Sequence, residues 1–304
     1  MLVSSPPSSL KRLVRCQANT TAEVTLLEAR VRVTGPGSVL DGLAAIRTQL
    51  PAWLEPPSWE RQPTDLLVRL DDAASGLLSV LRDGVLLLET HDEGAAAAAL
   101  EWALVDETIR QNATRYLLVH AGAVGLDGQG VILPAQSGGG KSTLVAALIA
   151  SGGFEYFSDE VAVVGLETRG LLPLAKSIVL RNGSRRALEG IIPELRTRPY
   201  QQRFDEVVTY LPAAPQCLPS GPQPVRFVVA PRYVPGGGNS LTPLHPTAAL
   251  RLIVEQSFNA RLLGSRAIRT TAALVREAQC FELQFDEVAD AVSRLRACLA
   301  TAAQ

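Results

Sequence analysis

Residues 135–142, AQSGGGKS, follow the spacing of a phosphate-binding loop, G-x-x-x-x-G-K-[ST], with alanine in place of the first glycine. In such a loop backbone N–H groups surround phosphate oxygens, a lysine bridges the β- and γ-phosphates, and a hydroxyl holds Mg²⁺. The alternative is a glycine-rich turn that caps a helix and leaves its lysine in solvent. The predicted nucleotide contacts in this stretch are Ser137, Gly138, Gly139, Gly140, Lys141, Ser142 and Thr143.

The residues on either side of the loop favour phosphate binding. Residues 130–133, GVIL, predict a strand, and residues 142–151, STLVAALIAS, predict a helix. Phosphate binding requires this order of strand, loop and helix. Since glycine is needed at the first loop position only for a positive φ or a close backbone approach, Ala135 predicts a slightly altered loop rather than a lost one.

An acidic pair, Asp159 and Glu160, lies in the next predicted strand, residues 154–164. Phosphoryl transfer needs a carboxylate for Mg²⁺ and usually a second one to orient or deprotonate the attacking hydroxyl. Adjacent strand residues point to opposite faces, so both acids reach one site only at a strand end or a strand break. The predicted metal ligands are Ser142, Asp159 and Glu160, and the alternative is a solvated pair at a sheet edge.

His120 and a group of basic residues complete the set of candidates. His120 lies among apolar residues, in LLVHAGAV, where a satisfied core histidine and a catalytic one are both consistent with the pattern. Residues 181–203 hold six arginines and two glutamates, a local charge of +4. Arginine grips phosphate and carboxylate groups bidentately, yet a solvated basic face explains most of these positions better. Lys176 and Arg181 are the two that we select for a role in binding.

The surrounding pattern predicts an α/β protein in two parts. Residues 1–113 predict a smaller N-terminal α/β domain: strands at 23–33, 65–71 and 79–90, a helix at 39–50 and an alanine-rich helix at 93–113. Residues 114–304 predict a second domain that carries the loop. Strands are expected there at 115–135, 154–164, 226–233 and 280–285, with helices across 247–278 and at 287–300.

Composition excludes several classes of protein. The chain has 304 residues, 47% of them hydrophobic, and a formal net charge of −1, which gives no sign of a nucleic-acid or anionic-membrane partner. Its four cysteines form no CxxC pair, so we expect free thiols rather than a zinc site. No signal peptide or membrane-spanning stretch is recognisable, and the expected location is cytoplasmic.

Taken together, His120, the loop and the acidic pair resemble the HPr kinase/phosphorylase family, and in particular its diverged HPr-kinase-like relatives. The resemblance covers residues 115–182, in which a strand histidine precedes the loop and a pair like the family's SDD follows the helix. Phosphoenolpyruvate carboxykinases share the fold more distantly. The fold that this resemblance implies is a P-loop kinase domain of the HPr kinase and phosphoenolpyruvate carboxykinase type.

The resemblance implies roles for individual residues. Lys141 and Ser142 would hold phosphate and metal, Asp159 would act on the acceptor hydroxyl, Glu160 would lie near Mg²⁺, and His120 would be catalytic. Arg181 joins the nucleotide contacts, and the cofactors implied are ATP and Mg²⁺. Two departures stand out: Glu160 replaces an aspartate, and the glycine-rich signature of true HPr kinases is not intact in residues 187–195.

These departures argue against HPr itself as the substrate. Diverged relatives of this size include kinases encoded with lasso peptides and other ribosomally made peptides, where they phosphorylate a serine of the precursor. The favoured hypothesis is therefore an ATP-dependent serine kinase acting on a peptide or small protein. An ATP-binding sensor or scaffold without phosphoryl transfer, and a small-molecule kinase, remain as alternatives. Substrate capture and formation of a homo-oligomer are equal guesses for the first domain.

Overall fold

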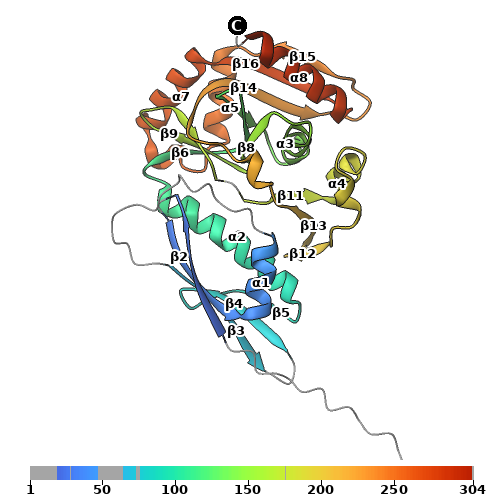
Figure 1. Ribbon diagram of the computed structural model, residues 1–304. Helices are drawn as coiled ribbons and strands as arrows, with labels where there is room; N and C mark the ends of the chain where they lie inside the picture. Colours follow the sequence, from blue (N-terminus) through green and yellow to red (C-terminus); the bar gives the residue numbers. More distant parts are fainter. Residues whose placement is uncertain (1–18, 28, 47–63, 73–75, 175, 303–304) are drawn as a thin grey trace, which may run out of the picture.

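The structure is a computed structural model that describes residues 19–27, 29–46, 64–72, 76–174 and 176–302. Within these residues the chain is a mixed α/β protein with three sheets, of five, eight and three strands. Figure 1 shows the N-terminal part below the larger C-terminal part, with α2 between them. The fold class expected from the sequence is confirmed at this coarse level. No helix among the described residues is long and apolar enough to cross a membrane.

The N-terminal part is a five-stranded sheet with two helices, in the strand order β1-β2-β3-β4-β5. Its elements are β1 (Asn19–Leu26), β2 (Ala29–Pro36), α1 (Gly37–Ile46), β3 (Thr64–Asp72), β4 (Leu77–Arg82), β5 (Val85–Thr90) and α2 (Glu93–Asn112). The single strand predicted over 23–33 is wrong, because β1 and β2 form an antiparallel hairpin through Leu27, whose φ is +55°. Residues 47–50 of the predicted first helix lie outside the described residues.

Helix α2 begins where the sequence predicts, because Asp92 caps it. The Asp92 carboxylate accepts hydrogen bonds from Gly94 N at 2.7 Å and Ala95 N at 3.1 Å. The run of alanines at 95–99 is buried, so the helix axis can approach the strands below it closely. Helix α2 packs on β2, β3, β4 and β5 and on α1.

The C-terminal part is built around an eight-stranded sheet in the order β10-β9-β6-β7-β14-β16-β15, with β8 paired to β6. Strand β14 is parallel to both β7 and β16, and its pairing with β10 closes the first five strands of this order into a ring. The elements as far as α4 are β6 (Tyr116–Leu126), β7 (Gln129–Pro134), α3 (Lys141–Ala150), β8 (Phe154–Ser158), β9 (Val161–Gly165), β10 (Gly170–Leu172), β11 (Ile178–Arg181) and α4 (Asn182–Leu188).

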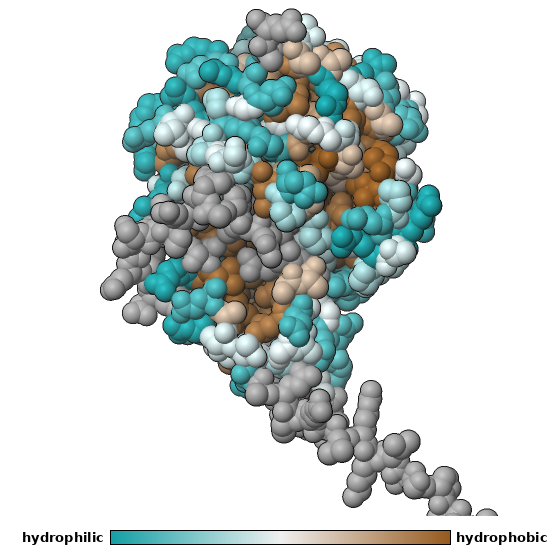
Figure 2. Space-filling view, viewed as in Figure 1, coloured by the Kyte–Doolittle hydropathy of each residue, from teal (hydrophilic) through white to brown (hydrophobic). Residues whose placement is uncertain are grey.

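The remaining elements complete this sheet, cover it and form the third sheet, β11-β13-β12. They are η1 (Pro193–Arg196), β12 (Gln201–Arg203), β13 (Glu206–Leu211), η2 (Pro215–Cys217), β14 (Gln223–Tyr233), β15 (Ser240–Pro243), α5 (Pro246–Glu255), α6 (Ala260–Leu263), α7 (Ser265–Glu277), β16 (Gln279–Phe285) and α8 (Val288–Ala302). One apolar cluster joins the sheet to α3 and α8, and another joins it to α5 and α7. Figure 2 shows hydrophilic residues over much of the outer surface, with apolar residues visible toward the middle.

The predicted domain boundary at residue 113 falls at the junction of α2 and β6. A single apolar cluster nevertheless spans it, since Leu100 and Leu104 of α2 share a core with Val208 and Tyr210 of β13. The Trp102 ring also meets the Phe204 ring edge-on, with centroids 5.4 Å apart. The N-terminal part therefore supports the three-stranded sheet directly.

The single strand predicted over residues 154–164 is wrong. It is two strands, β8 and β9, separated by Asp159 and Glu160. The Ser158 hydroxyl stabilises the break by accepting hydrogen bonds from Glu160 N at 3.3 Å and Val161 N at 3.0 Å. At such a break both acids are released from the alternation of a regular strand.

Candidate active site

The glycine loop lies between β7 and α3, as the sequence predicts. Gly138 and Gly140 have φ values of +85° and +88°, in the left-handed region that side chains other than glycine rarely occupy. A Cβ on Gly140 would lie 2.5 Å from Cζ of Phe285, so this position is closed to larger residues on steric grounds too. Gly140 is the N-cap of α3 and offers no side chain to bond the first N–H groups of the helix. The first residues of this helix, Lys141, Ser142 and Thr143, line the adjoining cavity.

Ala135 fits the first position of the loop without strain. Its φ is not positive, and its methyl group is buried 3.0 Å from where a Cβ on Gly139 would stand. Its carbonyl accepts a hydrogen bond from Nζ of Lys141 at 2.7 Å. The main chain of the loop therefore holds Lys141 in place. Alanine instead of glycine at position 135 causes no backbone strain in the loop.

Lys141 is a buried cation held by carbonyl oxygens. Nζ donates to the carbonyl of Ala135 and, at 3.0 Å, to that of Gln136. Burial lowers the pKa of Lys141 to about 8, although Glu160 and Asp159 oppose this effect. An anion beside Lys141 would favour its charged form and so oppose the effect of burial on its pKa.

The acidic pair is connected to the loop and to a buried lysine. Asp159 is buried and accepts hydrogen bonds from the Ser142 hydroxyl at 3.1 Å and from Val179 N at 3.1 Å. Nζ of Lys176 lies 3.0 Å from Oδ1 of Asp159 and 3.1 Å from Oε2 of Glu160. The Lys176 ammonium group therefore forms an ion pair with both carboxylates.

The neighbouring charges, rather than burial, decide the direction in which the pKa values of Glu160 and Lys176 shift. Burial alone would raise the pKa of Glu160, but Lys176 and Arg203 outweigh burial and lower it to about 2. Burial would lower the pKa of Lys176, and Asp159 and Glu160 raise it instead. At neutral pH Glu160 is therefore ionised and Lys176 is charged.

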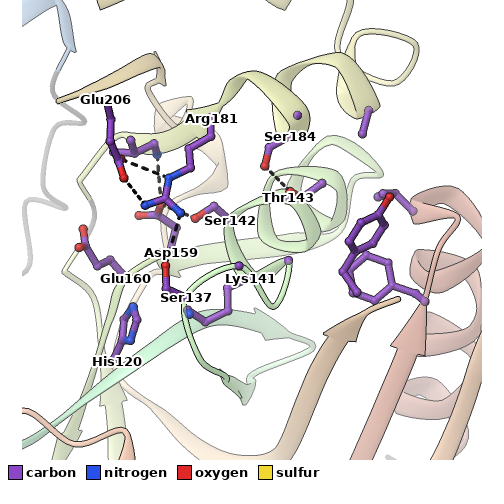
Figure 3. A pocket seen from close by; sticks show the side chains of 18 of the residues that line it. His120, Ser137, Lys141, Ser142, Thr143, Asp159, Glu160, Arg181, Ser184 and Glu206 are labelled. Atoms are coloured by element: carbon purple, nitrogen blue, oxygen red, sulfur yellow. Dashed lines mark hydrogen bonds and ion pairs between the residues drawn. The ribbon is translucent and has the colours of Figure 1, made fainter. Parts of the chain in front are cut away.

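His120 lies on β6 beside the acidic pair, where its ring lines the cavity. Burial, followed by the charge of Lys141, lowers the pKa of His120, so the neutral imidazole predominates at neutral pH. The ring packs against Phe258 with centroids 5.7 Å apart. Figure 3 shows His120 and Glu160 on one side of the site, and Thr143 with Ser184 on the other.

Arg181 joins the loop to the three-stranded sheet. Its guanidinium donates to the Glu206 carboxylate at 3.2 Å and to the Ser137 hydroxyl at 3.4 Å. The other arginines of residues 181–203 differ in whether they are buried or lie on the surface. Arg185 is buried and bonds the Thr209 hydroxyl at 2.9 Å, whereas Arg198 pairs with Glu194 on the surface. Arg181 and Arg203 are the two of the six that reach the site.

These side chains surround one cavity of about 500 Å³. The predicted site residues line it with two exceptions. Lys176 instead pairs with Asp159 and Glu160, and the Gly139 N–H closes the loop on the carbonyl of Gln136 at 3.1 Å. Ten lining residues are not among the predicted site residues: Val179, Gly183, Ser184, Ala187, Arg203, Glu206, Tyr233, Phe285, Asp286 and Val288. Tyr233 and Phe285 meet edge-on at 5.6 Å on the wall beside the loop. No signal marks them in the sequence, because they lie at the ends of β14 and β16, far along the chain.

Comparison with known proteins adds no assignment. Neither the family models nor the curated proteins contain a match to this chain.

Proposed function

We propose that this chain is a Mg·ATP-dependent kinase that phosphorylates a serine hydroxyl of a peptide or small protein, on a domain related to the HPr-kinase-like P-loop kinases. One observation carries the proposal. A buried lysine and the uncapped start of a helix face two carboxylates across a single cavity. Anion-binding groups on one side and proton- and metal-binding groups on the other are what phosphoryl transfer requires.

The glycine loop is the proposed phosphate site. The first N–H groups of α3 and the ammonium of Lys141 converge there, and both favour an anion. Arg181 stands at the rim, held by Ser137 and Glu206. An incoming phosphate can replace Glu206 as its partner, because guanidinium binds phosphate bidentately.

The donors of the site fit a magnesium ion. The Ser142 hydroxyl and Asp159 carboxylate lie 3.1 Å apart, and Glu160 is adjacent. Oxygen ligands from one or two carboxylates, together with phosphate oxygens, are what Mg²⁺ takes in such sites. Bound there, the ion would neutralise charge on the transferring phosphoryl group. Among the described residues no group of three histidine, cysteine or acidic side chains forms a ready-made metal site, so the nucleotide would complete it.

The acceptor hydroxyl is proposed to enter beside His120 and the acidic pair. Its oxygen attacks the γ-phosphorus, the bond to the bridging oxygen breaks, ADP leaves, and the hydroxyl proton passes to the Asp159 carboxylate. Glu160 is a poor proton acceptor because its pKa lies near 2. Its lasting charge suits the metal side of the site. His120, neutral at this position, can accept a hydrogen bond from the entering hydroxyl.

Tyr233 and Phe285 form the proposed site for the nucleotide base. They lie against Gly140, and the ring of Tyr233 is exposed while that of Phe285 is buried. A flat base can stack on such a ring without any hydrogen bond that reads its identity. The base would then lie beyond the loop, opposite the acceptor side of the cavity.

The proposed acceptor is a flexible peptide, and a ribosomally made precursor peptide is the favoured source. The resemblance to HPr-kinase-like relatives supports this choice, as does the loss of the signature that true HPr kinases carry at 187–195. An unstructured peptide end can thread into a cavity lined by the acidic pair at modest ordering cost.

The test is to incubate the protein with Mg·ATP and candidate peptides that carry a terminal serine, with folded HPr in parallel, and to measure the mass of each product. A gain of one phosphoryl group on a peptide is the expected result. Phosphorylation of HPr alone would restore the parent family's substrate. Modification of none, with ATP bound, would favour the sensor hypothesis, and transfer to small hydroxyl compounds would favour a small-molecule kinase.

A further inference from the structure

Residues 257–270 present an unusual surface next to the active site. This segment contains α6 and the start of α7, and three of its large apolar side chains face solvent. Phe258 is 47% exposed, Leu262 is 64% exposed and Ile268 is 47% exposed. Its neighbours Asn259, Leu263 and Ala267 are buried and anchor the segment to the body of the protein. The segment is therefore packed against the protein on one side and exposes these apolar side chains on the other.

Arginines alternate with these apolar residues. Arg261, Arg266 and Arg269 are exposed within the same segment. Residues 256–276 contain four arginines and no acidic residue, a charge of +4 in a chain whose net charge is −1. A surface that is basic and apolar at once is complementary to a chain that is acidic and apolar.

The segment begins at the mouth of the active site. Phe258 packs against His120, and its N–H donates to the carbonyl of Leu118 at 2.9 Å. Strands β6 and β9 run away from this point, from the pair His120 and Val161 to the pair Tyr116 and Gly165. Four residues of strand span about 13 Å. The segment follows these strands, with α7 beside β9 in Figure 1.

The segment ends at a second cavity of about 300 Å³. Arg266 donates to the carbonyl of Thr114 at 3.4 Å, and the Thr270 hydroxyl donates to that of Leu166 at 2.8 Å. These contacts place the start of α7 over the far end of β6 and β9. The residues that line the cavity are Leu166, Glu167, Arg169, Arg266, Arg269, Thr270 and Ala273.

Three arginines and one acid, Glu167, line this cavity. Arg169 is fixed there by an ion pair of 3.1 Å with Glu277, yet its Nε is buried with no hydrogen-bond partner. A buried guanidinium N–H without a partner is costly, and the guanidinium groups that line the cavity can bind a carboxylate. The cavity is therefore suited to an anionic group at the far end of the segment.

We propose that residues 257–270 and this second cavity form the docking surface for an acidic, apolar-containing stretch of the acceptor peptide. The inference rests on the proposed function for the existence of that peptide. The peptide's apolar residues cover Phe258, Leu262 and Ile268, and its carboxylates bind the arginines. At about 3.3 Å per extended residue, the span of about 13 Å places the start of the acidic stretch about four residues from the phosphorylated serine.

The experiment compares three peptides that share one serine: an acidic-apolar sequence, the same sequence with its acids replaced by amides, and a version with the acids moved next to the serine. Binding is measured by fluorescence anisotropy without ATP, on versions with the serine replaced by alanine. Steady-state kinetics give kcat and KM. The variants are Arg266→Glu/Arg269→Glu and Leu262→Ser, with Arg226→Glu, an exposed arginine on β14, as the control.

Reversing two charges should raise KM for the acidic peptide about tenfold or more, since two attractions become repulsions. KM for ATP and kcat should be unchanged, and Leu262→Ser should raise KM for the peptide with no effect on the salt dependence. The amidated and rearranged peptides should bind the wild type weakly, and Arg226→Glu should behave as the wild type.

Two results would overturn the docking surface: equal binding of the acidic and amidated peptides, or an unchanged KM in Arg266→Glu/Arg269→Glu while transfer proceeds. The second result would leave the kinase function standing. Binding of the acidic peptide that depends on Arg266 and Arg269, with no transfer to it, would support the docking surface and contradict the kinase function. Tighter binding of an oligoribonucleotide than of the acidic peptide would also overturn the proposal.

Discussion

Lys176 is the buried group on which the geometry of the acidic pair depends, and replacing it tests that dependence. Its ammonium lies 3.0 Å from Asp159, which is buried, and 3.1 Å from Glu160, which is partly exposed. In Lys176→Met the chain keeps a side chain of similar length but loses the charge. Two carboxylates are then left without their shared cation, which is the most expensive arrangement for buried acids.

The expected loss of stability in Lys176→Met can be calculated from the pKa of Glu160, which falls from 4.5 to about 2 in the folded protein. At 1.36 kcal/mol per unit this is about 3 kcal/mol, an upper value because Glu160 is partly exposed. Breaking a buried ion pair costs about 3–5 kcal/mol in general. Because Arg203 remains and Glu160 is partly exposed, we expect Lys176→Met to lower the free energy of unfolding at pH 7 by up to about 3 kcal/mol.

The pH dependence gives a sharper test than the loss itself. Because the folded pKa of Glu160 is depressed, its contribution in the wild type is complete above its unfolded pKa, 4.5, and is lost as the pH falls toward 2. In Lys176→Met the largest charge that lowers the Glu160 pKa is gone while Arg203 remains, so this pKa should rise. The variant should therefore lose less stability than the wild type as the pH falls from 4.5 toward 2, whereas Glu101, whose pKa burial raises, favours folding at low pH in both proteins.

Urea unfolding at a series of pH values measures both quantities. Arg226→Met removes an exposed cation and should change stability by less than about 0.5 kcal/mol. Adding Glu160→Gln to Lys176→Met should recover part of the loss, since one buried charge is removed. A loss below about 1 kcal/mol for Lys176→Met, or the same pH dependence as the wild type, would refute the assignment of Lys176 as the shared counter-ion.

Three further outcomes follow from the site. Lys141→Ala should weaken ATP binding, measured by calorimetry, and abolish transfer, because the phosphates lose a charge-assisted contact; unchanged affinity and turnover would remove the phosphate-loop hypothesis. Asp159→Asn should retain ATP binding and lower kcat by orders of magnitude, whereas Glu160→Gln should raise the Mg²⁺ concentration required; reversed effects would exchange the two roles. Tyr233→Ala should raise KM for ATP by about 5- to 150-fold, the equivalent of 1–3 kcal/mol of stacking, with kcat unchanged; an unaltered KM would place the base elsewhere.

The order of strand, glycine loop and helix could be predicted because its features are local. Strand, loop and helix follow one another within residues 129–150, and glycine, lysine and hydroxyl positions are fixed by spacing alone. The break between β8 and β9 is local too. A serine just before two acids favours a turn in which its hydroxyl bonds the following N–H groups, and Ser158 forms this turn. The apolar residues on both sides of the acidic pair led instead to the prediction of one continuous strand over 154–164.

The rest of the cavity could not be predicted, because its residues come from elements far apart in the sequence. Arg203 and Glu206 flank the turn of a hairpin whose place depends on α2, and Tyr233 lies at the end of a strand set by its pairing with β7 and β16. The arginine-rich stretch shows the same limit. Charge alone cannot tell that Arg185 is buried against Thr209 while Arg181 reaches the loop.

Glu101 shows how far the N-terminal part enters the chemistry of the site. The sequence places it in an alanine-rich helix with no apparent role, and the structure buries it beneath the acidic cluster, with both carboxylate oxygens lacking a hydrogen-bond partner among the described residues. Burial raises its pKa, and Lys176 and Arg203 only partly oppose this. Glu160, near the same two cations, shifts the other way because Lys176 contacts it directly. Two glutamates that share one set of charges therefore favour opposite protonation states, and the contact with Lys176 decides which one stays ionised.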